Sequence, residues 1–333
     1  MHARVLVSLG AVLLLVAAGM FMVRGAPDAE NRLGRELTDG IRRMGAGGSE
    51  GPTRGLPAPR VALFSDELEQ ADTLTFRVEG VPGGDPPQAT LGRKRVAFVR
   101  LPAEDAWVGI AGFDVNEEPE TYDLRLEFSG GASFAKTLTL ARRLFPVSEL
   151  AVSDALRERG YTPQTIVEDI VAKENRAIRE ALAARTAQAY FGGAFRAPLG
   201  ETTVVGAYGN VRKSGGWELQ HLGVDLMAAV GTEVFAVNDG AVRFIADLVN
   251  YGKTLVLDHG LGIYSLYLHL DSVSLSEGER VEKGQVIART GGSGYALEPH
   301  LHFSVKVDGA SVDPLRFVRA TEQAFGGGKG GNP

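Results

Sequence analysis

The chain has 333 residues, 44% of them hydrophobic, and a formal net charge of −6 at pH 7. The length exceeds that of one typical domain, and the negative charge argues against a nucleic-acid partner. There is no cysteine, which excludes disulfides and a lipidated N-terminal cysteine but leaves the redox compartment open.

The N-terminal segment predicts export. Arg4 precedes the apolar run 5–23, which approaches the roughly 20 residues that span a bilayer and exceeds the core of a usual signal peptide. We therefore expect an uncleaved signal anchor in residues 1–25, which holds the protein at the inner membrane with the rest of the chain in the periplasm or another extracytoplasmic space. A cleaved signal peptide is the alternative, because small residues that could form a cleavage site occur at Ala17, Ala18, Gly19 and Gly25.

Two segments have the composition of flexible chain. Residues 26–59 are rich in glycine and proline, and residues 321–333 end in a run of glycines. Such sequences bury too little apolar surface to order themselves. We predict a flexible linker in the first segment and a disordered tail in the second.

Residues 60–145 show repeated period-two patterns. In the segments 73–79 and 121–128 apolar residues alternate with polar ones, and turn-forming clusters occur at 82–87 and 130–131. Several short strands at this spacing predict a small immunoglobulin-like β-sandwich. No chemical motif is visible in it, so a spacer or binding module is expected.

A helical connector is predicted in residues 146–194. Thr162 before Pro163 has the pattern of an N-cap followed by a first-turn proline, and apolar residues recur at helical spacing as far as Arg185. A helix that packs between two domains is the favoured interpretation. An inhibitory segment lying over the catalytic cleft is the alternative.

The segment 195–320 contains the residues that could carry chemistry. Five of the six histidines lie between His221 and His302, and Asp225 follows the first of them by four residues. A hydrolytic zinc keeps three protein ligands and an open position for water, whereas a structural zinc is usually closed by four ligands, often cysteines. Histidine and aspartate without cysteine therefore favour a catalytic zinc site.

Strand periodicity indicates how these side chains are presented. In the segment 299–307 alternation places His300 and His302 on the face opposite three apolar residues. The segment 262–270 also alternates, which predicts His269 on the same face as Tyr267. Glycines around these segments indicate short strands joined by tight turns.

Several motifs in this order resemble the lysostaphin-type, LytM-like zinc endopeptidases of cell walls. The resemblance covers about 120 residues, from near Phe195 to Phe317. It implies a C-terminal LytM-like antiparallel β catalytic domain, and thus a mainly β chain. The segments that carry the resemblance are 221–225 (HLGVD), 231–240 (GTEVFAVNDG), 258–260 (DHG), 267–270 (YLHL), 281–285 (VEKGQ) and 299–303 (PHLHF).

The resemblance implies a role for each of these polar residues. His221, Asp225 and His302 would bind zinc, whereas His269 and His300 would be catalytic without binding the metal. The substrate would be the peptide stems of bacterial peptidoglycan. The remaining histidine of the segment 258–260 is expected at a turn, in a structural or ligand-supporting role.

Two features depart from the family pattern. Glu298 stands where many relatives have glycine, and the loop 208–216 before the first ligand is shorter than in many relatives and has a different residue pattern. Members of the family cleave Gly-Gly bonds or cross-links that end in diaminopimelate. For this chain we expect the direct cross-link to be the bond that is cleaved.

Two other functions compete with the peptidase. A catalytically inactive LytM-like regulator could bind the wall or activate a partner hydrolase, although such relatives usually lack metal ligands. The segment 281–288 also resembles lipoyl-like barrels of membrane adaptor proteins. Those barrels do not need clustered histidines, so the enzyme is preferred.

Overall fold

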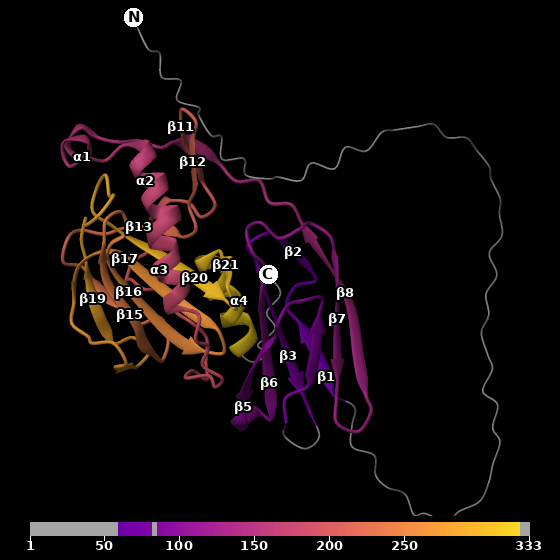
Figure 1. Cartoon of the computed structure of the whole chain (residues 1–333). Helices are drawn as coiled ribbons and strands as arrows, with labels where there is room; N and C mark the ends of the chain where they lie inside the picture. Colours follow the sequence, from indigo (N-terminus) through magenta and orange to yellow (C-terminus); the bar gives the residue numbers. More distant parts are fainter. Residues whose placement is uncertain (1–58, 82–84, 327–333) are drawn as a thin grey trace, which may run out of the picture. The chain divides into compact units, whose positions relative to one another are not determined.

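Figure 1 shows the computed structural model, which describes residues 59–81 and 85–326 as mainly β-structure. The predicted signal anchor and all but the last residue of the predicted linker lie outside these ranges. Within them, no helix is long and apolar enough to cross a membrane.

The first β region consists of two four-stranded sheets that share one apolar core. Their orders are β1-β3-β6-β5 and β2-β8-β7-β4. On β7 exposed and buried residues alternate, as the sequence pattern predicts. The strands are β1 (Arg60–Leu63), β2 (Glu67–Glu69), β3 (Thr73–Glu79), β4 (Gln88–Leu91), β5 (Ala97–Leu101), β6 (Ala106–Gly112), β7 (Thr121–Glu127) and β8 (Ser133–Ala141), with a 3-10 turn η2 (Pro102–Glu104).

In strand β3 the polar residues of the alternating pattern are buried as well as the apolar ones. All but its last residue are buried, because helix α4 (Pro314–Phe325) lies against it and Thr75 Oγ1 donates to Ala320 O at 3.1 Å. The same helix corrects the predicted tail. Residues 321–325 are helical, and Thr321 is fully buried, where its hydroxyl accepts from Phe195 N at 3.1 Å.

The predicted connector helix begins at Pro163, with Thr162 as N-cap in a capping box with Thr165. It ends at Ala181 rather than Arg185, and a π-turn interrupts it. Its apolar residues pack on the C-terminal sheet, where Ile178 joins a cluster with residues of β16 and β17. The connector elements are β9 (Val147–Glu149), α1 (Asp154–Glu158), α2 (Pro163–Asp169), η3 (Ile170–Glu174) and α3 (Asn175–Ala181).

The C-terminal β region is built on a ten-stranded sheet with the path β10-β13-β20-β17-β16-β15-β18. β14 pairs with β19, β19 also pairs with β17, and β21 pairs with β20; the hairpin β11–β12 pairs with β9 of the connector. Its strands are β10 (Val204–Gly206), β11 (Val211–Ser214), β12 (Trp217–Gln220), β13 (Val224–Met227), β14 (Glu233–Phe235), β15 (Gly240–Leu248), β16 (Gly252–Gly260), β17 (Ile263–Val273), β18 (Arg280–Val281), β19 (Val286–Thr290), β20 (His300–Val307) and β21 (Ala310–Val312).

Candidate metal centre

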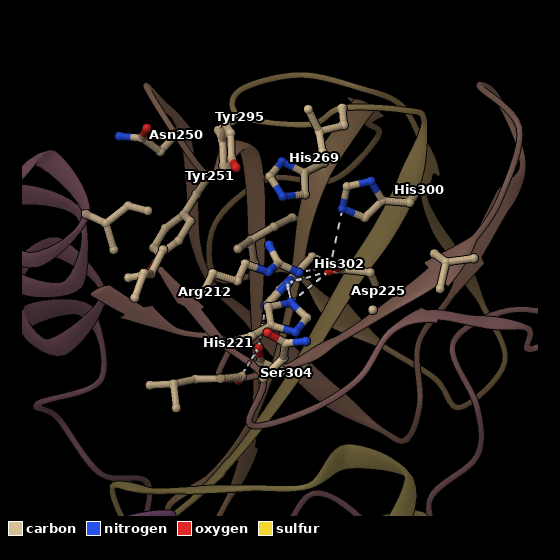
Figure 2. Close-up of a pocket in the computed structure, with 18 of the residues that line it drawn as sticks. Arg212, His221, Asp225, Asn250, Tyr251, His269, Tyr295, His300, His302 and Ser304 are labelled. Atoms are coloured by element: carbon tan, nitrogen blue, oxygen red, sulfur yellow. Dashed lines mark hydrogen bonds and ion pairs between the residues drawn. The ribbon is translucent and has the colours of Figure 1, made fainter. Parts of the chain in front are cut away.

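Adjacent strands bring the predicted ligands together. β13 pairs with β20 so that Asp225 lies opposite His302, and His221 lies just before β13. The three candidate ligand atoms form a triangle, in which each atom lies 2.9 Å from the other two. They are His221 Nε2, Asp225 Oδ1 and His302 Nδ1. All three residues are buried, and Figure 2 shows their side chains converging.

Hydrogen bonds at the far side of each ring orient the two imidazoles. His221 Nδ1 lies 2.9 Å from Ala207 O, and a carbonyl only accepts, so this nitrogen carries the proton. His302 Nε2 lies 2.9 Å from Ser304 Oγ, which itself donates to Leu222 O at 2.8 Å, so His302 donates through Nε2. The unprotonated nitrogens of both rings therefore face each other and the carboxylate.

The carboxylate is held ionised. Burial acts against its charge, but the positive charge that His221 carries when it is protonated in the absence of a metal lowers the pKa of Asp225 well below its ordinary value. Its second oxygen, Oδ2, accepts from Arg212 Nη2 at 2.7 Å. Sequence reasoning missed this arginine, which lies in the segment noted for its short length and different residue pattern.

These donors fit a zinc ion. Two neutral imidazoles and a carboxylate are common ligands of catalytic zinc, and bonds of about 2.0–2.1 Å at tetrahedral angles separate ligand atoms by about 3.3 Å. The separations of 2.9 Å are close to that value. Without a cation, three lone pairs would face one another in a buried space, so the geometry supports a metal.

His269 and His300 lie beside this triangle without joining it. Their ring centroids are 4.8 Å apart. His269 Nδ1 lies 2.9 Å from Ser293 O and His300 Nδ1 lies 2.8 Å from Glu298 O, so each Nδ1 donates to a carbonyl and each Nε2 is left for other partners. His300 Nε2 is 3.5 Å from an oxygen of Asp225.

The orientation of His269 corrects the sequence prediction. Strict alternation would place it with Tyr267, whose hydroxyl instead accepts from Val237 N in the core on the far side of the sheet. His269 has φ of 60° and lies among irregularities in the pairing of β17. Such a bulge re-aims one side chain, here into the cavity lined by Leu266 and Leu268.

The triangle and both further histidines line one cavity of about 680 Å³. The connector helix contributes Ile170, Asn175 and Ile178 to its wall. Glu298, the departure from the family pattern, also lines it. The connector is therefore part of the cavity as well as a packing element.

A buried carboxylate attaches the connector to the loop beside His269. Glu174 is 3% exposed. Its Oε1 accepts from Asn250 N at 2.8 Å and from Asn250 Nδ2 at 3.1 Å, and its Oε2 accepts from Tyr251 N at 2.9 Å. Tyr251 O in turn accepts from His269 N at 3.0 Å. No local sequence signal marked Glu174, because its partners lie about 76 residues away.

His259 lies away from the cavity, within β16 rather than at the predicted turn. It is fully buried, with Nδ1 2.8 Å from Asp239 O and Nε2 2.8 Å from Ser265 Oγ. Burial lowers its pKa to about 4 from 6.5. These contacts support a structural role.

The lowered pKa of His259 predicts a pH dependence of stability. A histidine with a depressed folded-state pKa contributes stability that is complete above pH 6.5 and is lost as pH falls towards 4. The difference corresponds to about 3 kcal/mol. We expect His259→Gln to flatten the urea-measured stability curve between these pH values. Measurements in the presence of a chelator separate this effect from metal release. Parallel curves of stability against pH for the wild type and His259→Gln would contradict the prediction.

Comparison with known proteins identifies the family of this region. Residues 219–314 match Peptidase family M23. The DD-carboxypeptidase/endopeptidase Mpg of Neisseria meningitidis serogroup B is 36% identical over 107 residues, which are 32% of this chain and 24% of that protein. The murein hydrolase activator EnvC of Escherichia coli is 40% identical over 97 residues, which are 29% of this chain and 23% of that protein. The chain thus spans about a quarter of the length of these relatives.

A solved structure extends the likeness beyond this region. A Pseudomonas aeruginosa protein assigned to peptidase M23 superposes with a TM-score of 0.50 at 22% identity, and the match covers 75% of this chain and 94% of that one. At this identity the match shows the fold alone.

Proposed function

The chain carries a LytM-like domain of peptidase family M23 at residues 219–314, and from it we propose that the protein is a zinc-dependent endopeptidase that hydrolyses peptide cross-links of bacterial peptidoglycan. The observation that carries the proposal is the buried triangle of His221 Nε2, Asp225 Oδ1 and His302 Nδ1, with both imidazole lone pairs turned inward. Relatives named as peptidoglycan DD-endopeptidases support the substrate class.

We propose that His221, Asp225 and His302 hold the zinc, which when bound lowers the pKa of a water to about 7 and polarises a carbonyl. His269 and His300 would act at Nε2, the nitrogen that their hydrogen bonds to carbonyls leave free. One ring, neutral, accepts a proton from the attacking water at Nε2, and the other, protonated to an imidazolium, donates a hydrogen bond from Nε2 to the developing oxyanion. Both functions need the rings beside the ligands, and His300 lies on the same strand as His302.

The domain plan is part of the proposal. We assign residues 60–145 to an immunoglobulin-like sandwich, 146–194 to the connector and 195–320 to the catalytic domain, with a signal anchor or signal peptide at 1–25. The protein would then act in the cell envelope. The two packed sheets of the first β region support a sandwich, whereas the anchor rests on sequence alone.

The alternative is an inactive regulator, which the similarity to the activator EnvC favours. The complete set of three metal-ligand residues favours the enzyme instead. The two functions differ in whether the purified protein alone releases fragments from walls.

Digestion of purified walls tests the proposal. We expect about one zinc per chain, release of peptide fragments from sacculi with direct cross-links, loss of activity in chelator and recovery on adding zinc. Mass spectrometry of the fragments identifies the bond, and walls with glycine bridges serve as the comparison. A protein that holds no zinc and digests neither wall would overturn the assignment.

A further inference from the structure

The cavity extends from the candidate metal centre along strand β20. Alternation places His300, His302, Ser304 and Lys306 on one face of this strand, and all four line the cavity. A strand rises about 3.3–3.4 Å per residue, so the Cα of Lys306 lies about 13 Å from that of His302. Figure 2 shows the beginning of this floor, with His269 and His300 on one side of His302 and Ser304 on the other.

Apolar side chains flank the floor between the metal centre and Lys306. Leu266 and Leu268 of β17 lie next to β20, and Ile178 of the connector packs in the same cluster as these leucines. The connector chain continues alongside this floor towards Lys306. There Ala184 of the connector accepts a hydrogen bond at its carbonyl oxygen from Tyr264 OH, at 3.2 Å. Tyr264 is the register partner of Lys306. The lysine therefore lies at the end of a largely apolar groove.

The ammonium group of Lys306 has no partner within residues 59–81 and 85–326. Among the described residues, none forms a hydrogen bond or an ion pair with Lys306 Nζ. Asp114 is the carboxylate that acts on it electrostatically, but Asp114 already accepts from Ser311 N at 2.8 Å and from Asn116 N at 3.0 Å. The side chain is half-buried, and burial lowers the pKa of Lys306.

We infer that Lys306 binds a free carboxylate of the peptide substrate, at a distance of about four extended residues from the bond that is cut. A carboxylate would supply the missing counter-charge and accept a charge-assisted hydrogen bond. The apolar walls would cover the intervening peptide. This inference rests on the proposed peptidase function and specifies its substrate class, namely a peptide with an acidic group remote from the scissile bond.

Paired substrates test the inference in the full chain. The experiment compares two cross-linked peptides. They differ only in one group remote from the scissile bond, which is a carboxylate in one peptide and a carboxamide in the other. A charge-assisted hydrogen bond corresponds to roughly ten- to hundred-fold in affinity. We expect Lys306→Met to raise KM for the carboxylate peptide by about this factor and to leave its kcat little changed. Neither KM nor kcat for the carboxamide peptide should change much. Lys306→Arg should keep most of the preference.

Matched controls exclude indirect effects. Lys136→Met removes an exposed lysine that pairs with Asp66 in the first β region, and it should change neither KM. If Lys306→Met does not fold, Lys306→Gln takes its place. Equal effects on both peptides, or none on either, would overturn the inference.

Failure of the proposed function would give a different result. A wild-type protein that cleaves neither peptide nor walls contradicts the peptidase. Calorimetric binding of the same two peptides then still decides the lysine site. A carboxylate preference that Lys306→Met removes supports the site, whereas equal affinity of wild-type protein for both peptides overturns it.

Discussion

Alanine at His302 is expected to remove both the metal and the activity, whereas alanine at His300 removes the activity and leaves the metal. The two residues lie on one face of β20, two positions apart, but only His302 directs a nitrogen into the triangle with His221 and Asp225. Loss of a zinc ligand should abolish turnover, and loss of a proton-transfer group reduces it by about 10²–10⁴-fold.

The same division applies to the other members of the centre. His221→Ala and Asp225→Ala should behave like His302→Ala, and His269→Ala should behave like His300→Ala. The measurements are zinc content after gel filtration and the rate of fragment release from sacculi. Circular dichroism shows whether each variant is folded. Equal loss of zinc from His300→Ala and His302→Ala would show that the assignment of the His-Leu-His pair is wrong.

Alanine at Glu174 is expected to destabilise the protein by about 3 kcal/mol or more and to lower kcat, with zinc retained. The substitution leaves three donors of Asn250 and Tyr251 without their acceptor. A buried polar group left unpaired costs about 1–3 kcal/mol. The loop that loses these bonds also supplies the carbonyl that accepts from His269 N, so the position of this ring should become less well defined.

Glu168→Ala provides the matched control, because Glu168 is an exposed residue of the same connector and, among the described residues, its side chain accepts only a local bond, from Gln164. Its effect on stability should be within about 0.5 kcal/mol. Urea unfolding measures the change in free energy, and hydrogen exchange at the His269 amide reports the loop directly. Slow exchange at this amide in Glu174→Ala, together with unchanged stability, would contradict the prediction.

Much of the candidate centre follows from short-range patterns. The period-two pattern of 299–307 was sufficient to place His300 and His302 on one face, because side-chain direction in a strand depends only on neighbouring residues. Thr162 and Pro163 likewise marked the start of the connector helix, since an N-cap acts within one turn. The resemblance in residues 195–317 then predicted a LytM-like domain, which the match to family M23 confirms.

Only the tertiary structure decided which distant residues meet. Asp225 lies opposite His302 because β13 pairs with β20, and Glu174 reaches its loop because the connector packs on the sheet. The burial of the polar face of β3, against which α4 lies, and the bulge at His269 also override local alternation. Sequence periodicity describes one strand or helix at a time, whereas register, packing partners and backbone irregularities depend on contacts between elements far apart in the chain.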